Sequence, residues 1–320
     1  MAKAKAETGS GQIQSRTPGQ IAWLHFRRNR VGVIAGIFSI AFLLASLLAP
    51  LEARLLGINP DELNLDILDE SGVPKLPWGG ISREHPLGIV PGTGRDLLAQ
   101  LLYGSRISFL IMIVSTTLTL FVGMIAGVVG GFFGGKVDNA IGRYGDFILA
   151  FPSFFMIVAL ADPAVDRIQR AGLAQDNGAR ILFLIVILSF FGWVYFARLI
   201  RSQVLSLRER DFITAAQALG SSKIRIIFKE LIPNIWAPVI VVVSLSLPGY
   251  LTAEAVFSYL GIGIQPPGYT WGLLIAKSTR FVMAMPTFFI ITTTTLVMVV
   301  LAFNLLGDAL RDALDPRNGK

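Results

Sequence analysis

The sequence contains no cysteine and only two histidines, which excludes several kinds of chemistry. Without cysteine there is no disulfide, no thiolate metal site and no cysteine nucleophile. His25 and His85 lie far apart in the chain and leave little material for a metal centre. Charged residues are also scarce, because Asp, Glu, Lys and Arg make up 15% of the 320 residues, whereas a typical soluble domain carries about a quarter.

Signatures of catalysis are missing as well. The sequence has no GxxxxGK[ST] run, so the chain has no phosphate-binding loop and cannot hydrolyse ATP by itself. The HExxH and GxSxG patterns of metalloproteases and serine hydrolases are also absent. These absences argue against a membrane-embedded enzyme, and we expect no catalytic residue, no cofactor and no metal on this chain.

Apolar residues dominate what is present. They make up 53% of the chain, and the mean hydropathy is +0.63. A stretch that crosses about 30 Å of hydrocarbon as a helix needs roughly 20 apolar residues. Six stretches are long enough, so we predict an all-α, polytopic membrane protein with transmembrane helices near 31–50, 107–131, 141–161, 181–200, 235–262 and 282–306.

The basic residues predict the orientation of the spans. The net charge of +7 is concentrated in short segments beside apolar runs, around Arg27, Arg28 and Arg30, around Lys136 and Arg143, and in the central loop. Cytoplasmic flanks of membrane spans are enriched in Lys and Arg. We therefore place these segments and both termini in the cytoplasm, and the positive charge needs no nucleic-acid partner.

These assignments divide the chain into five parts. Residues 1–18 are polar and expected to be disordered, and 19–30 mixes aromatic and basic residues like a short interfacial helix. The predicted parts are a cytoplasmic tail with this helix (1–30), the first transmembrane helix (31–50), an acidic extracytoplasmic segment (51–106), a five-helix core with a cytoplasmic loop at 201–234 (107–306) and a cytoplasmic tail (307–320).

The loop between the fourth and fifth spans is polar and basic, and residues 211–234 read DFITAAQALGSSKIRIIFKELIPN. Residues 215–219 favour a short helix that Gly220 ends. A second amphipathic run covers 223–231, and Pro233 favours an extended conformation at Ile232. This order of helix, glycine hinge, helix and proline predicts a small rigid docking element at the membrane surface, although an ordinary amphipathic loop would read similarly.

The loop resembles the cytoplasmic "EAA" signature of permease subunits in ATP-binding-cassette importers. The matching positions are Ala215, Ala216, Gly220, Ile232, Pro233 and Asn234, whereas Thr214 and Glu230 stand where the family usually has glutamate and histidine. In that family the loop forms a coupling helix that sits in a groove of the ATPase subunit. The resemblance implies that Pro233 and Asn234 end the loop, and it implies ATPase-coupling roles for Asp211, Phe212, Thr214, Ala215, Ala216, Leu219, Gly220 and Arg225.

Other stretches resemble the same family. The runs 85–88 (HPLG) and 94–96 (GRD) match a motif of the peptide-permease branch, with a linker that is one residue longer here. The C-terminal run matches at Asn304, Gly307, Asp308, Arg311, Asp312, Asp315, Pro316 and Arg317. The resemblance extends over about residues 27–317 and points to the dipeptide/oligopeptide/nickel branch, and to its C-type permease.

Three features inside the spans are candidates for packing or function. A ladder at Gly123, Gly127, Gly131 and Gly135 predicts close packing against another helix, in this chain or in a partner. Asp146, ahead of Pro152, resembles the family, although an interfacial Asp146 with a kink at Pro152 is the alternative. Glu254 is an intramembrane carboxylate and therefore a candidate for a pathway, gating, proton-binding or structural role, and Trp271 is expected to anchor the chain at the interface.

The resemblance implies a type I ABC importer permease fold and one half of a translocation pathway in the bacterial cytoplasmic membrane. It also implies a second homologous permease, two ATPase subunits that carry ATP and Mg, an extracytoplasmic solute-binding protein and surrounding lipid. The expected cargo is di- or oligopeptides, with nickel or another solute as the alternative. A proton-coupled secondary transporter that uses Glu254 is the competing hypothesis.

Overall fold

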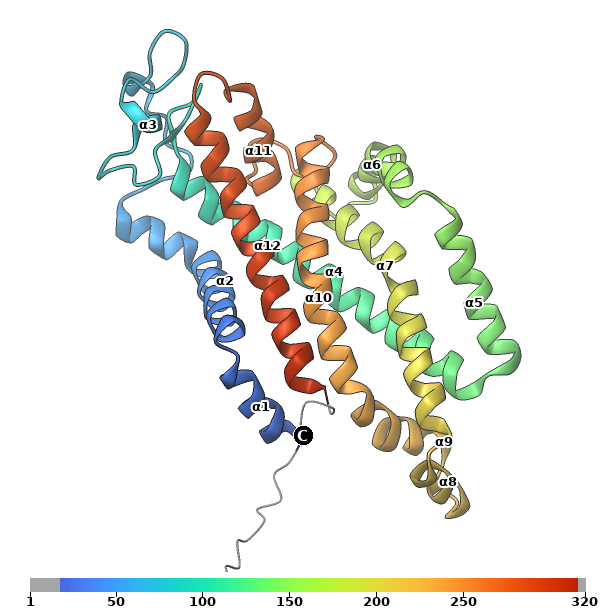
Figure 1. Cartoon of the computed structure of the whole chain (residues 1–320). Helices are drawn as coiled ribbons and strands as arrows, with labels where there is room; N and C mark the ends of the chain where they lie inside the picture. The colour runs from blue at the N-terminus through green and yellow to red at the C-terminus, as the bar shows by residue number, and fades with distance from the viewer. Residues whose placement is uncertain (1–17, 316–320) are drawn as a thin grey trace, which may run out of the picture.

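The computed structural model describes residues 18–315, and most of them lie in helices that run side by side (Figure 1). The chain begins with α1 (Pro18–Arg28) and α2 (Arg30–Leu56). The two helices are separated at Asn29, whose side-chain oxygen accepts a hydrogen bond of 2.9 Å from the Gly32 amide and thereby caps α2. The short helix expected before the first span is confirmed, while the predicted disorder falls on residues that, apart from Pro18, lie outside the described range.

Five helices of the described region are long and apolar enough to cross a membrane. They are α2, α4 (Leu97–Phe133), α7 (Asp176–Arg208), the continuous helix Lys223–Tyr259, and α12 (Pro286–Leu314). A sixth crossing is possible only as a bent pair, because α5 (Gly135–Ala150) and α6 (Ser153–Arg170) meet at 80°.

The unbroken third span predicted at 141–161 is therefore wrong. Phe151 and Pro152 are extended, with ψ of 134° and 97°. Proline disfavours helical geometry in the residue before it, so α5 ends at Ala150 and α6 begins after Pro152. The alternative interpretation of Pro152 as a kink is confirmed, and α5 and α6 run in different directions in Figure 1.

The segment between α2 and α4 folds over one end of the bundle. It contains η1 (Leu65–Ile67), α3 (Pro77–Gly80) and a small antiparallel hairpin in which β1 (Ile89–Val90) pairs with β2 (Arg95–Asp96). Asp96 caps α4, because its Oδ1 accepts a 2.7 Å hydrogen bond from the Ala99 amide, and its Oδ2 lies 2.8 Å from His85 Nδ1. The hairpin thus brings together the HPLG and GRD motifs at the start of α4.

The glycine ladder packs α4 against α7 of the same chain, which answers the question that the sequence left open. A Cβ at Gly127 would lie 2.6 Å from the Ala197 carbonyl oxygen, and one at Gly131 would lie 2.9 Å from the Val204 side chain. At Gly135 a Cβ would meet nothing within 4 Å, so this residue belongs to the turn into α5. The absence of side chains on one face of α4 therefore allows close contact between the two backbones.

Helix α10 (Ile232–Tyr259) ends as expected, since Gly261 adopts a φ of +77° and the chain turns into α11 (Trp271–Arg280). The anchoring role expected for Trp271 is wrong. Its side chain is fully buried, its Nε1 donates a 3.1 Å hydrogen bond to the Leu101 carbonyl, and its ring packs edge-on against Phe109. The reason is that α11 folds back against the beginning of α4.

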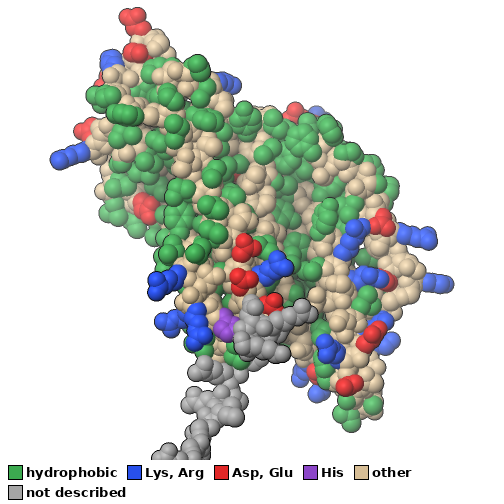
Figure 2. Space-filling view, viewed as in Figure 1, with side chains coloured by type: hydrophobic (Ala, Val, Ile, Leu, Met, Phe, Trp, Pro, Cys, Tyr) green, Lys and Arg blue, Asp and Glu red, His purple; other side chains and the backbone are tan. Residues whose placement is uncertain are grey.

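The two ends of the bundle differ. In Figure 1, α1, the end of α12, and the short helix α8 (Asp211–Ala218) lie at one end, whereas α3 and α11 lie at the other. Figure 2 shows hydrophobic side chains over the middle of this face, with Lys and Arg gathered toward the end that carries α1 and α8. Basic side chains thus lie at the end of the bundle where the basic flanks of the apolar runs meet.

Candidate functional site

The central loop forms a compact projection at one end of the molecule (Figure 1). Helix α8 ends at Ala218, and Gly220 follows with a φ of +77°. The Gly220 amide donates to the Gln217 carbonyl (2.9 Å) and the Ser221 amide donates to the Ala216 carbonyl (3.0 Å). These bonds satisfy carbonyls that the helix end would otherwise leave unpaired. The short helix and its glycine stop are confirmed.

Ile213, with the partly buried Ala216 beside it, attaches α8 to the bundle. Ile213 is fully buried and belongs to a cluster with Ile226 and Leu231 of the following helix and with Val204 and Ile200 of α7. Burial of an isoleucine side chain stabilises by about 1.5–3 kcal/mol. The projection is therefore held against both α7 and the helix that leads into α10.

The outer surface of the projection is unusually apolar. Leu219 is 86% exposed, Ile224 is 71% exposed and Phe228 is 65% exposed. Phe212 is partly exposed beside them. We call Phe212, Leu219, Ile224 and Phe228 the apolar tip. The other predicted coupling residues that lie on the surface are Asp211, Thr214, Ala215, Gly220 and Arg225, while Ala216 is half-buried.

The second half of the loop does not end at the proline. Ile232 is helical (φ −56°, ψ −44°), so the extended conformation predicted there is wrong. Helix α9 (Lys223–Arg225) passes through a π-helical turn, η2 (Ile226–Leu231), directly into α10. Within this turn the Ile232 amide bonds to the Ile227 carbonyl, five residues back.

The π-helical turn explains how Pro233 is accommodated. Proline lacks an amide hydrogen and its ring crowds the carbonyl four residues earlier, which normally breaks a helix. Here the helix is widened just before Pro233, and Asn234 donates a 2.6 Å side-chain hydrogen bond to the Glu230 carbonyl. The second half of the loop is consequently continuous with a membrane-length helix that runs to Tyr259.

Glu254 lies inside the bundle and is fully buried. Its two carboxylate oxygens accept hydrogen bonds of 2.7 Å from Ser108 of α4 and from Ser258 of α10. The hydroxyl of Thr270, which caps α11, also hydrogen-bonds to the carboxylate. The carboxylate thus connects three helices, and buried polar groups of this kind are stable only when they are satisfied.

Asp146 has a very different environment. It lies on α5, is 71% exposed, and forms a 2.6 Å ion pair with Arg198 of α7. Asp138 and Arg201 make a second link between the same helices, in which Arg201 Nη2 donates to Asp138 Oδ2 at 2.6 Å. Neither Arg198 nor Arg201 was among the predicted site residues, although an ionisable residue at the end of an apolar run is a usable signal.

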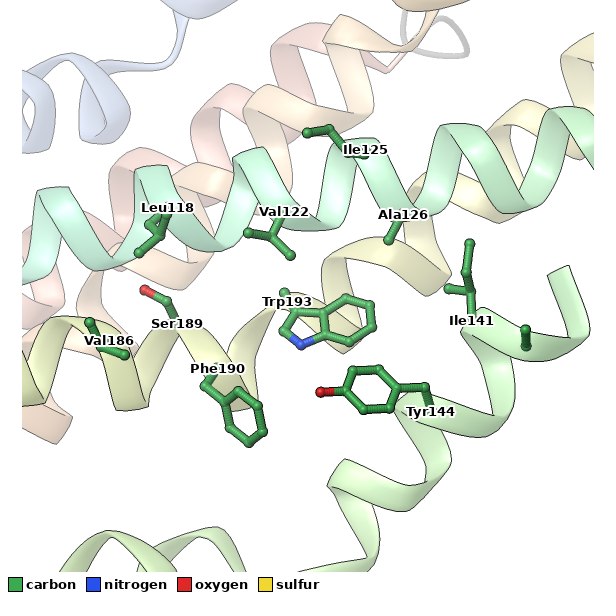
Figure 3. A pocket seen from close by; sticks show the side chains of 11 residues that line it. Leu118, Val122, Ile125, Ala126, Ile141, Tyr144, Val186, Ser189, Phe190 and Trp193 are labelled. Atoms are coloured by element: carbon green, nitrogen blue, oxygen red, sulfur yellow. The ribbon is translucent and has the colours of Figure 1, made fainter. Parts of the chain in front are cut away.

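Two grooves flank α7. The first, of about 680 Å³, lies between α4, α5 and α7 and is lined almost entirely by apolar side chains, with Tyr144 stacked on Trp193 at 6.1 Å (Figure 3). The second, of about 470 Å³, lies between α6, α7 and α10 and includes the polar side chains of Ser153, Tyr195 and Thr252. The first groove suits an acyl chain or an apolar helix, whereas the second can also contact a polar solute.

The geometry describes a polytopic helical membrane protein with a rigid apolar tip at one end. Comparison with known proteins identifies the family. Residues 119–320 match the family described as the binding-protein-dependent transport system inner membrane component, and residues 17–65 match the N-terminal transmembrane domain of oligopeptide transport permease C.

Similar curated proteins are permeases as well. The chain is 33% identical to the dipeptide transport system permease protein DppC of Alkalihalophilus pseudofirmus, over 96% of this chain and 92% of that protein. It is 36% identical to the oligopeptide transport system permease protein OppC of Mycobacterium bovis (91% and 92%), and 32% identical to the glutathione transport system permease protein GsiD of Pectobacterium atrosepticum (94% and 92%).

The chain therefore belongs to the family of inner membrane components of binding-protein-dependent transport systems, as a permease of the C type. A solved structure agrees with this fold. The chain superposes on one from the inward-facing MetNI methionine ABC transporter with a TM-score of 0.54 at 18% identity, over 68% of this chain and 98% of that one. The resemblance noted in the sequence is confirmed.

Proposed function

We propose that the chain forms one half of the translocation pathway of an ATP-driven peptide importer, and that separate ATPase subunits dock on residues 211–234. The observation that carries this proposal is the apolar tip. Leu219, Ile224 and Phe228 are more than 60% exposed on a projection that buried Ile213 and Ile226 hold against the bundle. An exposed apolar patch with polar surroundings is typical of a protein interface.

The connection of the tip to α10 supports a coupling role. A groove on an ATPase that grips the tip would pull on Ile213 and on the helix that begins at Lys223. Because that helix is continuous to Tyr259, the displacement reaches the depth of Glu254 and the groove beside α6. Nucleotide binding would then shift the equilibrium between inward-facing and outward-facing forms through differential affinity.

The pathway residues form part of the same proposal. Arg198 lies ten residues before the end of α7 at Arg208, which corresponds to about 15 Å along a helix. An exposed ion pair at such a depth is costly against lipid, so we place the Asp146–Arg198 pair against a partner subunit or a water-filled cavity. Glu254 has a structural or gating role within α4, α10 and α11, since its oxygens are already hydrogen-bonded.

The assembly that we propose contains a second, homologous permease, two ATPases that carry ATP and Mg, and an extracytoplasmic binding protein. We place both termini and the apolar tip in the cytoplasm, because Lys and Arg gather at the end that carries α1 and α8. The names of the relatives favour di- or oligopeptides as cargo. Nickel or another solute is the alternative, which binding measurements on the purified binding protein with peptides and Ni²⁺ would decide.

Gly220→Asp tests the coupling role. Nothing lies within 4 Å of a Cβ at Gly220 or at Gly57, and both have positive φ (+77° and +67°), so Gly57→Asp is a matched control at the other end of the molecule. We expect Gly220→Asp to insert into the membrane but to lose the co-purifying ATPases and ATP-dependent uptake. Leu219→Glu should act in the same way, because it places a charge on the apolar tip without disturbing the helix.

Normal uptake in both loop variants would refute the coupling assignment. Uptake that persists after ATP depletion, with the proton gradient maintained, would instead favour the secondary transporter. Gly57→Asp should leave uptake and ATPase binding unchanged.

A further inference from the structure

Three cationic side chains gather at the end of the bundle opposite the apolar tip. Lys277 and Arg280 lie three residues apart on α11 and therefore on the same face of that helix. Arg95 comes from β2, in the hairpin that packs against the end of α11, where a Cβ at Gly92 would lie 3.5 Å from the Phe281 ring. We call Arg95, Lys277 and Arg280 the outer cation cluster.

The outer cation cluster lacks matching negative charge. Among residues 18–315, neither Lys277 nor Arg280 forms an ion pair. Arg95 has only a long contact of 4.0 Å with Asp61, and its Nε is buried without a hydrogen-bond partner. Asp61 is 65% exposed, also accepts a hydrogen bond from the Tyr269 hydroxyl, and supplies one negative charge against the three cations.

This environment is unfavourable for a lysine. Burial lowers the pKa of Lys277, and the nearby charges of Arg95 and Arg280 lower that pKa further. An ammonium group that is partly removed from water without a partner costs free energy, as does the repulsion between like charges. A carboxylate that approaches from solvent would pair with Lys277 and Arg280.

We infer that the outer cation cluster binds a carboxylate side chain of the extracytoplasmic solute-binding protein. The inference rests on the proposed function, which supplies the binding protein and places it on the extracytoplasmic side of the membrane. Its own basis is the excess of three cations from two elements over the one nearby carboxylate of Asp61, and their place at the end of α11. An Asp or Glu on the docking protein would orient it over α11 and the hairpin, both of which contact α4.

The experiment measures the affinity of the co-purifying solute-binding protein for the complete transporter in lipid nanodiscs, with and without bound peptide. Lys277→Glu reverses the charge, Lys277→Arg keeps it, and Lys277→Met removes it but retains the length of the side chain. Lys75→Glu is the matched control, because Lys75 lies in the same outer region but is exposed and already donates a 2.7 Å hydrogen bond to the Asp66 carbonyl.

We expect Lys277→Glu to raise Kd about tenfold or more at low salt, since like-charge contacts in an interface are strongly unfavourable. The effect should shrink as salt rises. Lys277→Arg should bind within about twofold of the parent, and Lys75→Glu should do the same. Lys277→Met should weaken binding while raising the Tm of the transporter alone, a split that a purely structural lysine would not produce.

Other results would overturn the inference. An unchanged Kd in Lys277→Glu would refute it, and an equal loss in Lys75→Glu would reduce it to general electrostatic attraction. An effect seen only with the peptide-loaded binding protein would assign the carboxylate to the cargo. If the unmodified transporter binds no such protein, the proposed function fails, which is a distinct outcome from failure of the cluster.

Discussion

Replacement of Glu254 separates a structural role of this carboxylate from a chemical one. Glu254→Gln keeps the shape of the side chain and one hydrogen-bond acceptor, whereas Glu254→Leu removes both acceptors. The carboxylate receives hydrogen bonds from Ser108, Ser258 and Thr270. The two variants therefore differ in how many of these bonds they can keep.

The expected change in the free energy of unfolding follows from those three hydrogen bonds. Hydrogen bonds between membrane helices contribute about 0.6 kcal/mol on average and up to about 1.7 kcal/mol. Loss of all three in Glu254→Leu should therefore lower the free energy of unfolding by about 2–5 kcal/mol. Glu254→Gln loses the equivalent of one bond, because its amide group donates where the carboxylate accepted, and should cost about 1 kcal/mol.

The assay combines unfolding and transport. Unfolding is followed in mixed micelles with increasing denaturing detergent, and peptide uptake is measured in vesicles that contain ATP. Ser108→Ala, introduced into each background, provides the control. It should destabilise the parent by about 1 kcal/mol and the Glu254→Leu variant by much less, since the bond between the two residues is already absent there.

The decisive variant is Glu254→Gln. If Glu254 is structural, this variant should be folded and should retain most uptake. A folded Glu254→Gln protein without uptake would refute the reasoning, because an amide differs from a carboxylate chiefly in its ability to hold charge or exchange a proton. That result would support a proton or cation site at Glu254.

Two further predictions follow from packing and from electrostatics. Gly127→Ala should lower the free energy of unfolding by about 1–2 kcal/mol, since the new Cβ would lie 2.6 Å from the Ala197 carbonyl oxygen. Gly142→Ala is the control: nothing lies within 4 Å of its Cβ, so it should raise the free energy of unfolding by about 0.5–1 kcal/mol through helix propensity. Equal effects of the two substitutions in an unfolding assay would contradict the packing of α4 on α7. Burial and the hydrogen bond to a carboxylate raise the pKa of Tyr269 to about 12. The stabilisation that the protonated tyrosine gives to the outer segment should therefore be complete below about pH 10 and should be lost as the pH rises through 12. A spectrophotometric titration should show a late-ionising tyrosine that is absent in Tyr269→Phe.

Local features of the chain were predictable because their physical causes are local. Length and hydropathy indicated where membrane-length helices lie, and Gly220 indicated where α8 ends. The break at Pro152 was recognisable as an alternative, since proline restricts the residue before it. The same rule gave a wrong prediction at Pro233, because Ile232 before it is helical. The π-helical turn of η2 and the side chain of Asn234 accommodate it, and such compensation depends on several residues at once.

The candidate sites were predictable as residues but not as contacts. The order of residues was enough to predict that Glu254 lies within an apolar helix and that Gly127 belongs to a face without side chains, because both statements concern periodicity along one helix. The hydrogen bond from Ser108, which is 146 residues away, to Glu254 and the contact of Gly127 with α7 depend on how the helices pack in the folded chain. Helices in a membrane are similar in hydropathy on all sides, so their neighbours are selected by packing and by a few polar bonds that become visible only when the chain is folded.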